Sequence, residues 1–212
     1  MGPSLSFPLS DKIIPMTSAV EKLMSLDEFL AWERGQSQRY EFDGFAARLM
    51  TGGSLDHSTI ASKLWAALDN KLRGSGRRPF RGDAKVVANQ SVRYPDLSIT
   101  CSPISGSDDV VPEPVVVIEI LSPSTEREDR GRKKFDYFAT PSIRQYAIIE
   151  QDERRVELYT RTDTAWLDQI ITGDAVLSLS AVGVDIPLDA IYEDTELDAT
   201  RRPAGERSAP AA

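Results

Sequence analysis

Two acidic residues lie beside or within apolar stretches of the sequence, where a carboxylate is unusual. Asp96 comes just before the apolar stretch "LSIT", and Glu119 lies inside the apolar stretch "VVVIEIL". An ionised carboxylate in so apolar a strand loses much solvation free energy unless a cation or strong donors compensate it. If the two strands are neighbours, both carboxylates can converge on one hard cation such as Mg²⁺ or Mn²⁺, which prefers oxygen ligands. The pair therefore predicts a divalent-metal site.

A third group of residues follows Glu119 in the sequence. Asp129, Lys133 and Tyr137 are spaced four apart in a stretch typical of a helix, so they must share one face of it. An ammonium on that face can supply positive charge to a phosphate group, or to a water that attacks beside a metal ion. The alternative is a solvated helix face, because the neighbouring residues are also basic: Arg130, Arg132 and Lys134.

Asp96, Glu119 and His57 could also have purely structural roles. Asp96 follows a proline and could cap a turn. Glu119 could form a salt bridge to Arg130 or Arg132. His57 is the only histidine and invites assignment as a general base, but it stands in what reads as the first turn of a helix, where polar residues bind free amides. For His57 we favour a structural role or a substrate contact.

Composition and charge limit the classes of protein. The 212 residues carry 25 basic and 33 acidic side chains, a net charge of −8, which argues against binding nucleic acid through overall charge. A phosphate-bearing substrate then needs a divalent cation or a local basic patch, which we predict from Arg127, Arg130, Arg132 and Lys134. No apolar run approaches the roughly 20 residues of a membrane span. The single cysteine, Cys101, cannot form an internal disulfide. We expect no membrane partner and a cytoplasmic location.

Local patterns in the first half predict the elements that position these residues. A capping box at 25–28 predicts a short helix that ends at Gly35. The stretch "RYEFDGFAARLM" predicts a hairpin that turns at residues 43–44. Apolar residues at helical spacing over 54–72 predict an amphipathic helix. Residues 84–101 predict two strands.

The second half predicts a central strand followed by a helix. "PVVVIEIL" is nearly all apolar, which is typical of a strand covered on both faces. A capping-box pattern at 125–128 predicts a helix that runs to about residue 139. "QYAIIE" and "RVELYT" predict a hairpin, and "AWLDQIIT" another strand. We expect one α/β (α+β) domain over 16–193, with a mobile tail at 1–15 and a disordered one at 194–212.

These segments resemble a known family. "YEFDG", "LDHSTIASKL", "YPDLSI", "VVVIEILSPST", "DRGRKKFDY" and "QYAIIEQDERRVELYT" are similar to the Uma-two family of predicted restriction endonucleases, which belongs to the PD-(D/E)xK nuclease superfamily. The resemblance covers roughly residues 25–192. Its most specific parts are Glu119 followed by "LSPS" and the Asp129, Lys133 and Tyr137 spacing. It implies a restriction-endonuclease-like fold, a mixed central sheet flanked by helices.

The resemblance also implies roles for individual residues. Asp96 and Glu119 correspond to the metal ligands, and Glu41 adds a ligand or orients a water. The superfamily places a lysine two residues after the second acid, where this chain has Leu121, so Lys133 is the expected substitute. We assign substrate contacts to four further residues: His57, Arg127, Arg130 and Tyr137.

The function implied is divalent-metal-dependent hydrolysis of DNA phosphodiester bonds, with Mg²⁺ or Mn²⁺ as cofactor. Leu121 and the net charge of −8 favour a second interpretation, a nuclease-like fold that binds a nucleic acid or a protein without cutting. A third is a structural metal-binding or assembly protein. A homodimer would suit cutting of two strands.

Overall fold

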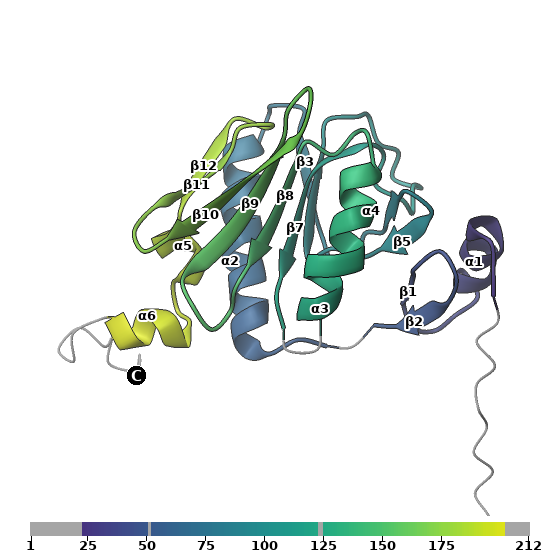
Figure 1. Cartoon of the computed structure of the whole chain (residues 1–212), viewed down its shortest axis with the longest axis horizontal. Helices are drawn as coiled ribbons and strands as arrows, with labels where there is room; N and C mark the ends of the chain where they lie inside the picture. The colour runs from purple at the N-terminus through teal and green to yellow at the C-terminus, as the bar shows by residue number, and fades with distance from the viewer. Residues whose placement is uncertain (1–22, 51, 123–124, 202–212) are drawn as a thin grey trace, which may run out of the picture.

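A six-stranded mixed sheet forms the centre of the computed structural model, which describes residues 23–50, 52–122 and 125–201 (Figure 1). The strands lie in the order β10 (Trp166–Thr172), β9 (Arg155–Arg161), β8 (Gln145–Ile149), β7 (Pro114–Ile120), β6 (Leu97–Thr100) and β3 (Arg78–Arg81). Strands β7 and β8 are parallel, and the other pairs are antiparallel. The mixed sheet with flanking helices confirms the predicted fold class, and β7 is central, as its apolar sequence predicts.

A smaller four-stranded sheet lies beside the first, in the order β2 (Ala47–Leu49), β1 (Tyr40–Phe42), β5 (Ser91–Arg93) and β4 (Val86–Ala88). Strands β1 and β2 form the predicted hairpin, whose turn places Gly44 at φ +89°. Helix α1 (Leu26–Glu33) has the predicted capping box at Ser25. Residues 84–101 contain three strands instead of the predicted two, because a turn with Asn89 at φ 55° separates β4 from β5.

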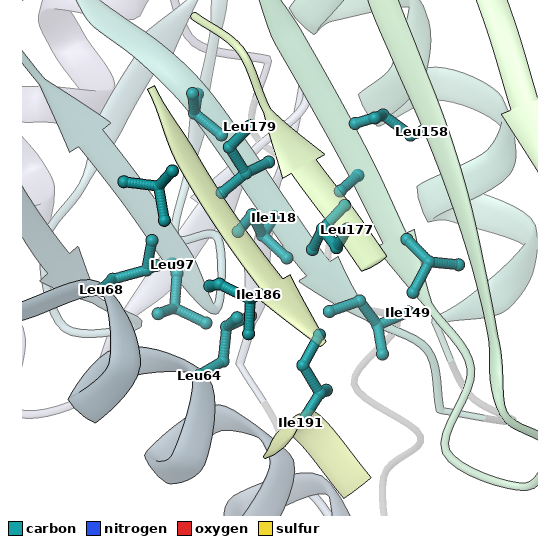
Figure 2. Packing of buried hydrophobic residues seen from close by; sticks show 14 of the residues in the cluster. Leu64, Leu68, Leu97, Ile118, Ile149, Leu158, Leu177, Leu179, Ile186 and Ile191 are labelled. Carbon is teal, nitrogen blue, oxygen red and sulfur yellow. The ribbon is translucent and has the colours of Figure 1, made fainter. Parts of the chain in front are cut away.

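Helix α2 (Leu55–Leu72) covers one face of the large sheet. Its buried stripe is Ile60, Leu64, Leu68 and Leu72, as the helical spacing predicts. The hairpin of β11 (Val176–Leu179) and β12 (Val184–Pro187), followed by α5 (Leu188–Tyr192), completes this apolar layer. Figure 2 shows side chains of α2, β12 and α5 gathered over Leu97, Ile118 and Ile149 of the sheet.

The opposite face is covered by a helical segment that connects β7 to β8 (Figure 1). The predicted continuous helix from 125 to 139 is in fact three pieces: α3 (Glu126–Glu128), a π-helical stretch η1 (Asp129–Lys133) and α4 (Lys134–Ala139). Thr125 makes no capping hydrogen bond to the helix, so the predicted capping box is absent. Its hydroxyl instead accepts from the Ser122 amide at 3.2 Å. Such π-helical insertions are frequent at functional sites.

The chain beyond residue 193 differs from the predicted disordered tail over the part that is described. Helix α6 (Glu196–Arg201) follows Thr195, whose buried hydroxyl donates to the Tyr192 carbonyl at 2.6 Å. Leu197 packs against the main apolar cluster, which the low apolar content of the segment obscures in the sequence. The predicted tail at 1–15 and residues 202–212 lie outside the described residues. Among the described helices, none combines the length and apolar character needed to cross a bilayer.

Candidate active site

The predicted metal ligands come from neighbouring strands. Strands β6 and β7 are paired with Leu97 opposite Ile118, so the antiparallel register carries Asp96 opposite Glu119. Both line one cavity of about 400 Å³ near the end of β7, together with Glu41, His57, Asp129 and Lys133. The structure therefore brings together the acids and the lysine that the sequence singles out.

Glu119 is buried, with 3% of its surface exposed. It belongs to the face of β7 that meets η1 and α4, where its Oε1 accepts from the Tyr137 hydroxyl at 2.7 Å and from Lys133 Nζ at 3.2 Å. Its salt-bridge partner is thus Lys133, and not Arg130 or Arg132. The shared face predicted from the four-residue spacing places both donors on the same oxygen.

Lys133 is held among three carboxylates. Its Nζ lies 3.2 Å from Oε1 of Glu41, 3.2 Å from Oε1 of Glu119 and 3.1 Å from Oδ1 of Asp129. Burial opposes the positive charge, but the three carboxylates outweigh it and raise the pKa of Lys133 well above its usual value. The side chain is therefore a permanent cation here and not a proton acceptor. A solvated helix face is excluded, because Lys133 is only 6% exposed.

The carboxylates outnumber the cations in this cavity. Burial raises the pKa of Glu119 well above its usual value, and the charges of Asp129, Asp96 and Glu41 act in the same direction against Lys133. Burial likewise raises the pKa of Asp129. Five carboxyl groups line the cavity against three basic side chains: Glu41, Asp96, Glu119, Glu128 and Asp129 against Arg48, His57 and Lys133. The cavity lining therefore has more carboxyl groups than basic side chains.

This donor set fits a hard divalent cation. Its donor atoms are carboxylate oxygens, and among the described residues the buried Oδ1 of Asp129 has an ion pair with Lys133 at 3.1 Å but no hydrogen bond of good geometry. Within the described residues, no three His, Cys, Asp or Glu side chains are arranged to hold an ion by themselves. Two carboxylates completed by waters suit Mg²⁺, which dehydrates reluctantly. Asp96 and Glu119 are the residues that would hold it.

Asp96 is fixed by contacts to β7 and α2. Its Oδ2 accepts from the Ile120 amide at 2.7 Å, and its Oδ1 lies 3.2 Å from His57 Nε2. This hydrogen bond crosses to the neighbouring strand, so Asp96 does more than cap its own turn. The bond to Asp96 raises the pKa of His57. His57, whose backbone amide binds the N-cap Ser54, thus contacts a candidate ligand at the cavity wall.

The sequence reasoning did not find Arg93, which fixes Glu41. Arg93 is fully buried in β5 and pairs with Asp136 at 2.8 Å, Glu41 at 3.3 Å and Glu128 at 3.5 Å. The Tyr94 amide donates to the other oxygen of Glu41 at 3.2 Å. A charged residue inside the strand pattern "SVRYPD" is the same signal that marks Glu119, and it could have identified Arg93.

The remaining predicted substrate contacts do not converge. Tyr137 is fully buried against Glu119, so it orients that acid and does not reach the cavity. Arg130 is neutralised by three glutamates: Glu126, Glu150 and Glu157. Arg132 lies 3.3 Å from Asp43, and Lys134 lies over the Tyr159 ring. Only Arg127 of the predicted basic patch is exposed without an acidic partner among the described residues.

A solved structure shares this fold. A solved structure described as a nuclease, "putative nuclease belonging to DUF820", from Anabaena variabilis matches 80% of this chain and 97% of its own with a TM-score of 0.66 and 16% identity. At that identity the likeness concerns the fold alone, a mixed α+β architecture.

The sequence comparisons give the family. The family model Uma2, described as "Putative restriction endonuclease", matches residues 26–189. Two Synechocystis proteins, both described as uncharacterized, are also similar: slr1290 is 32% identical over 173 residues, covering 80% of this chain and 91% of its own, and sll1609 is 25% identical over 165 residues, covering 75% and 93%. The chain belongs to the Uma2 family, which confirms the resemblance found in the sequence.

Proposed function

We propose that the protein is a divalent-metal-dependent endonuclease that hydrolyses phosphodiester bonds of DNA. The observation that carries the proposal is the excess of carboxylates around Lys133 in one cavity, with Asp96 and Glu119 on paired strands. Membership of a family of nucleases supports hydrolysis as the reaction class. Each residue's environment then suggests what it contributes.

Asp96 and Glu119 would hold Mg²⁺ or Mn²⁺. When bound, such an ion polarises the scissile phosphate and lowers the pKa of a coordinated water. The Ile120 amide and His57 fix the direction of Asp96, and Tyr137 fixes that of Glu119. Asp96 directly precedes β6 and Glu119 lies in β7, so the pairing of these two strands sets the separation of the acids before substrate arrives.

Lys133 would stabilise negative charge on the phosphate, and Glu41 would position the attacking water or the metal ion. The raised pKa of Lys133 keeps the ammonium protonated, so it stabilises negative charge that grows on the phosphoryl oxygens and does not accept a proton. Glu41 is held from one side by Arg93 and from the other by the Tyr94 amide. It can therefore orient a water or complete the metal coordination without moving.

A cleavage assay on supercoiled plasmid DNA tests this proposal. We expect nicking by the purified protein with Mg²⁺ or Mn²⁺ and none in excess chelator. A crystal soaked in Mn²⁺ should show an anomalous peak between Asp96 and Glu119. Cleavage that persists in chelator, or a peak located away from both acids, would reject the metal site.

One observation favours a second candidate, a nuclease-like protein that binds a nucleic acid or a protein without cutting. Leu121 fills the position of the usual lysine and packs in the apolar cluster with Val117 and Tyr137. Lys133 is already bound by three carboxylates, which restrains its ammonium. Binding of DNA by a protein that leaves the plasmid intact at every metal tested would select this candidate.

Cutting both strands of a duplex needs two active sites or two binding events. A homodimer in the cytoplasm is the simplest arrangement that we propose for this. Sedimentation of the purified protein with and without duplex DNA gives the oligomeric state directly. A single cleaved strand from a monomeric species would instead identify a nicking enzyme.

A further inference from the structure

Residues 70–82 form a basic surface segment of an acidic chain. They contain five basic residues and no acidic one, in a protein with a net charge of −8: Lys71, Arg73, Arg77, Arg78 and Arg81. All five are exposed. They stand at the end of α2, on the turn that follows and on the edge strand β3. We call them the β3 basic surface.

These cations differ from those on the helical segment after β7. Arg73 is paired with Asp69 at 3.3 Å, and Arg81 lies over the Trp65 ring. In the part of the chain that the structure describes, no carboxylate lies within ion-pair distance of Lys71, Arg77, Arg78 or Arg81. Their charge is therefore available to a partner.

The β3 basic surface leads to the candidate active site. Strand β3 pairs with β6, and Arg81 is opposite Leu97, the residue after Asp96. A Cβ on Gly82 would lie 3.8 Å from the Asp96 Cα, so the end of β3 touches the backbone of a candidate metal ligand. Helix α2 connects the same two regions, because His57 lies in its first turn and Arg73 follows its last residue.

Local structure explains only some of these basic residues. Lys71 and Arg73 complement the negative end of the α2 dipole. That reason does not apply to Arg77 and Arg78, which lie past the turn. Charged side chains on an edge strand also discourage pairing with other chains. Acidic side chains would serve that purpose equally, so it does not explain why all the charges here are positive.

We propose that the β3 basic surface binds the backbone phosphates of double-stranded DNA and guides the duplex to the cavity at Asp96 and Glu119. This rests on the proposed function and names the part of the surface that meets the substrate. Arginine is suited to phosphate because its planar group donates two parallel hydrogen bonds. Helix α2 rises about 24 Å from His57 to Arg73, which corresponds to about seven base pairs of B-form DNA. Contacts should therefore extend about that far to one side of the cut.

Salt titration of DNA binding tests the proposal. The variant Arg77→Gln/Arg78→Gln removes two charges from the surface, and the control Arg34→Gln/Arg144→Gln removes two from exposed positions outside it. Affinity for a labelled duplex is measured by anisotropy over a range of salt, with Mg²⁺ and in chelator. Because each phosphate contact contributes a slope of about 0.9 to the dependence of log K on log salt, the first variant should lose about 1.8 units of slope. Its affinity should fall on the order of tenfold at physiological salt, with no change in the control.

The outcomes separate this proposal from the proposed function. Equal losses in both variants would indicate a general charge effect and overturn the proposal, as would an unchanged first variant or a wild type that binds no duplex under either condition. If the wild type cuts no DNA but the first variant alone loses affinity, the β3 basic surface stands and the nuclease activity falls. If the wild type cuts DNA and the first variant binds as tightly as the wild type, the nuclease activity stands and the role of the β3 basic surface is rejected.

Discussion

Both faces of strand β7 are buried over residues 116–120, but only one of them carries a charged side chain. Val116, Ile118 and Ile120 belong to the apolar cluster beneath α2. On the other face, Glu119 lies between Val117 and Leu121, beneath η1 and α4. One strand thus carries both the main core and the candidate active site.

Strand β7 combines apolar burial with a buried charge. Burying apolar area stabilises the fold by about 25 cal/mol per Å², whereas a buried carboxylate costs free energy unless it is paired. Packing on the apolar face therefore fixes the position of β7. That rigidity holds the buried Glu119 carboxylate in place on the other face. Glu119 is tolerated because Lys133 and Tyr137 meet it from the helical segment.

The largest expected effect is a loss of cleavage activity when Glu119, on the charged face of β7, is substituted. Glu119→Gln keeps an oxygen for the Tyr137 hydroxyl but removes the charge that would bind the metal. Cleavage should fall on the order of a thousandfold, with the melting temperature nearly unchanged. Single-turnover cleavage and calorimetric Mg²⁺ binding measure this. Glu113→Gln, at an exposed position before the same strand, is the control, and equal activities of the two variants would contradict the assignment.

On the apolar face the corresponding effect is on stability. Ile118→Ala leaves a cavity beneath α2 and should lower the free energy of unfolding by about 3 kcal/mol. Urea denaturation followed by circular dichroism measures it, and Ile170→Ala, at a position 49% exposed, should cost far less. Cleavage below the unfolding transition should change little. If Ile118→Ala abolished cleavage while the protein remained folded, the two faces would not be separable.

A smaller effect is expected from the lysine that replaces the usual one. Lys133→Met should lower cleavage on the order of a hundredfold while metal binding stays nearly unchanged. Lys134→Met should do much less, because its side chain lies over Tyr159, away from Glu119. Adding Leu121→Lys to Lys133→Met should restore part of the rate, because residue 121 shares the face of Glu119. Equal rates for the two single variants would remove Lys133 from the mechanism.

The smallest effect concerns a buried carboxylate that has enough donors. Burial acts to raise the pKa of Asp43, but hydrogen bonds from the Ala46 amide, Arg48 and the Phe45 amide outweigh it and lower the pKa below 3.8. Its contribution to stability should be present above pH 3.8 and lost as the pH falls through the lowered value. Asp43→Asn should therefore cost about 1 kcal/mol at neutral pH.

Urea denaturation of both proteins at several pH values gives this difference directly. The stability difference between wild type and Asp43→Asn should shrink as the pH is lowered below 3.8. A difference that grows on acidification would mean that the pKa of Asp43, like that of Glu119, is raised in the folded protein. The contrast between a buried acid with a lowered pKa and one with a raised pKa would then disappear.

Much of the fold follows from local patterns in the sequence. The apolar stripe of α2, the near-continuous apolar run of β7 and the hairpin turn at Gly44 all lie where their periodicity predicts. Asp96 and Glu119 were identified for a related reason. A charge at the edge of or inside an apolar strand is anomalous by itself, so no knowledge of its neighbours is needed.

The pairing of charges was decided by the tertiary structure alone. Arg130 and Lys133 belong to the same basic run, yet Arg130 is neutralised by glutamates of β9 and its surroundings while Lys133 enters the candidate site. The π-helical stretch η1, the contact of His57 with Asp96 and the position of β3 beside that acid are equally absent from the sequence pattern. Periodicity determines which face of an element is buried, but the partner of a charge depends on which elements pack together, and those contacts join residues far apart in the chain.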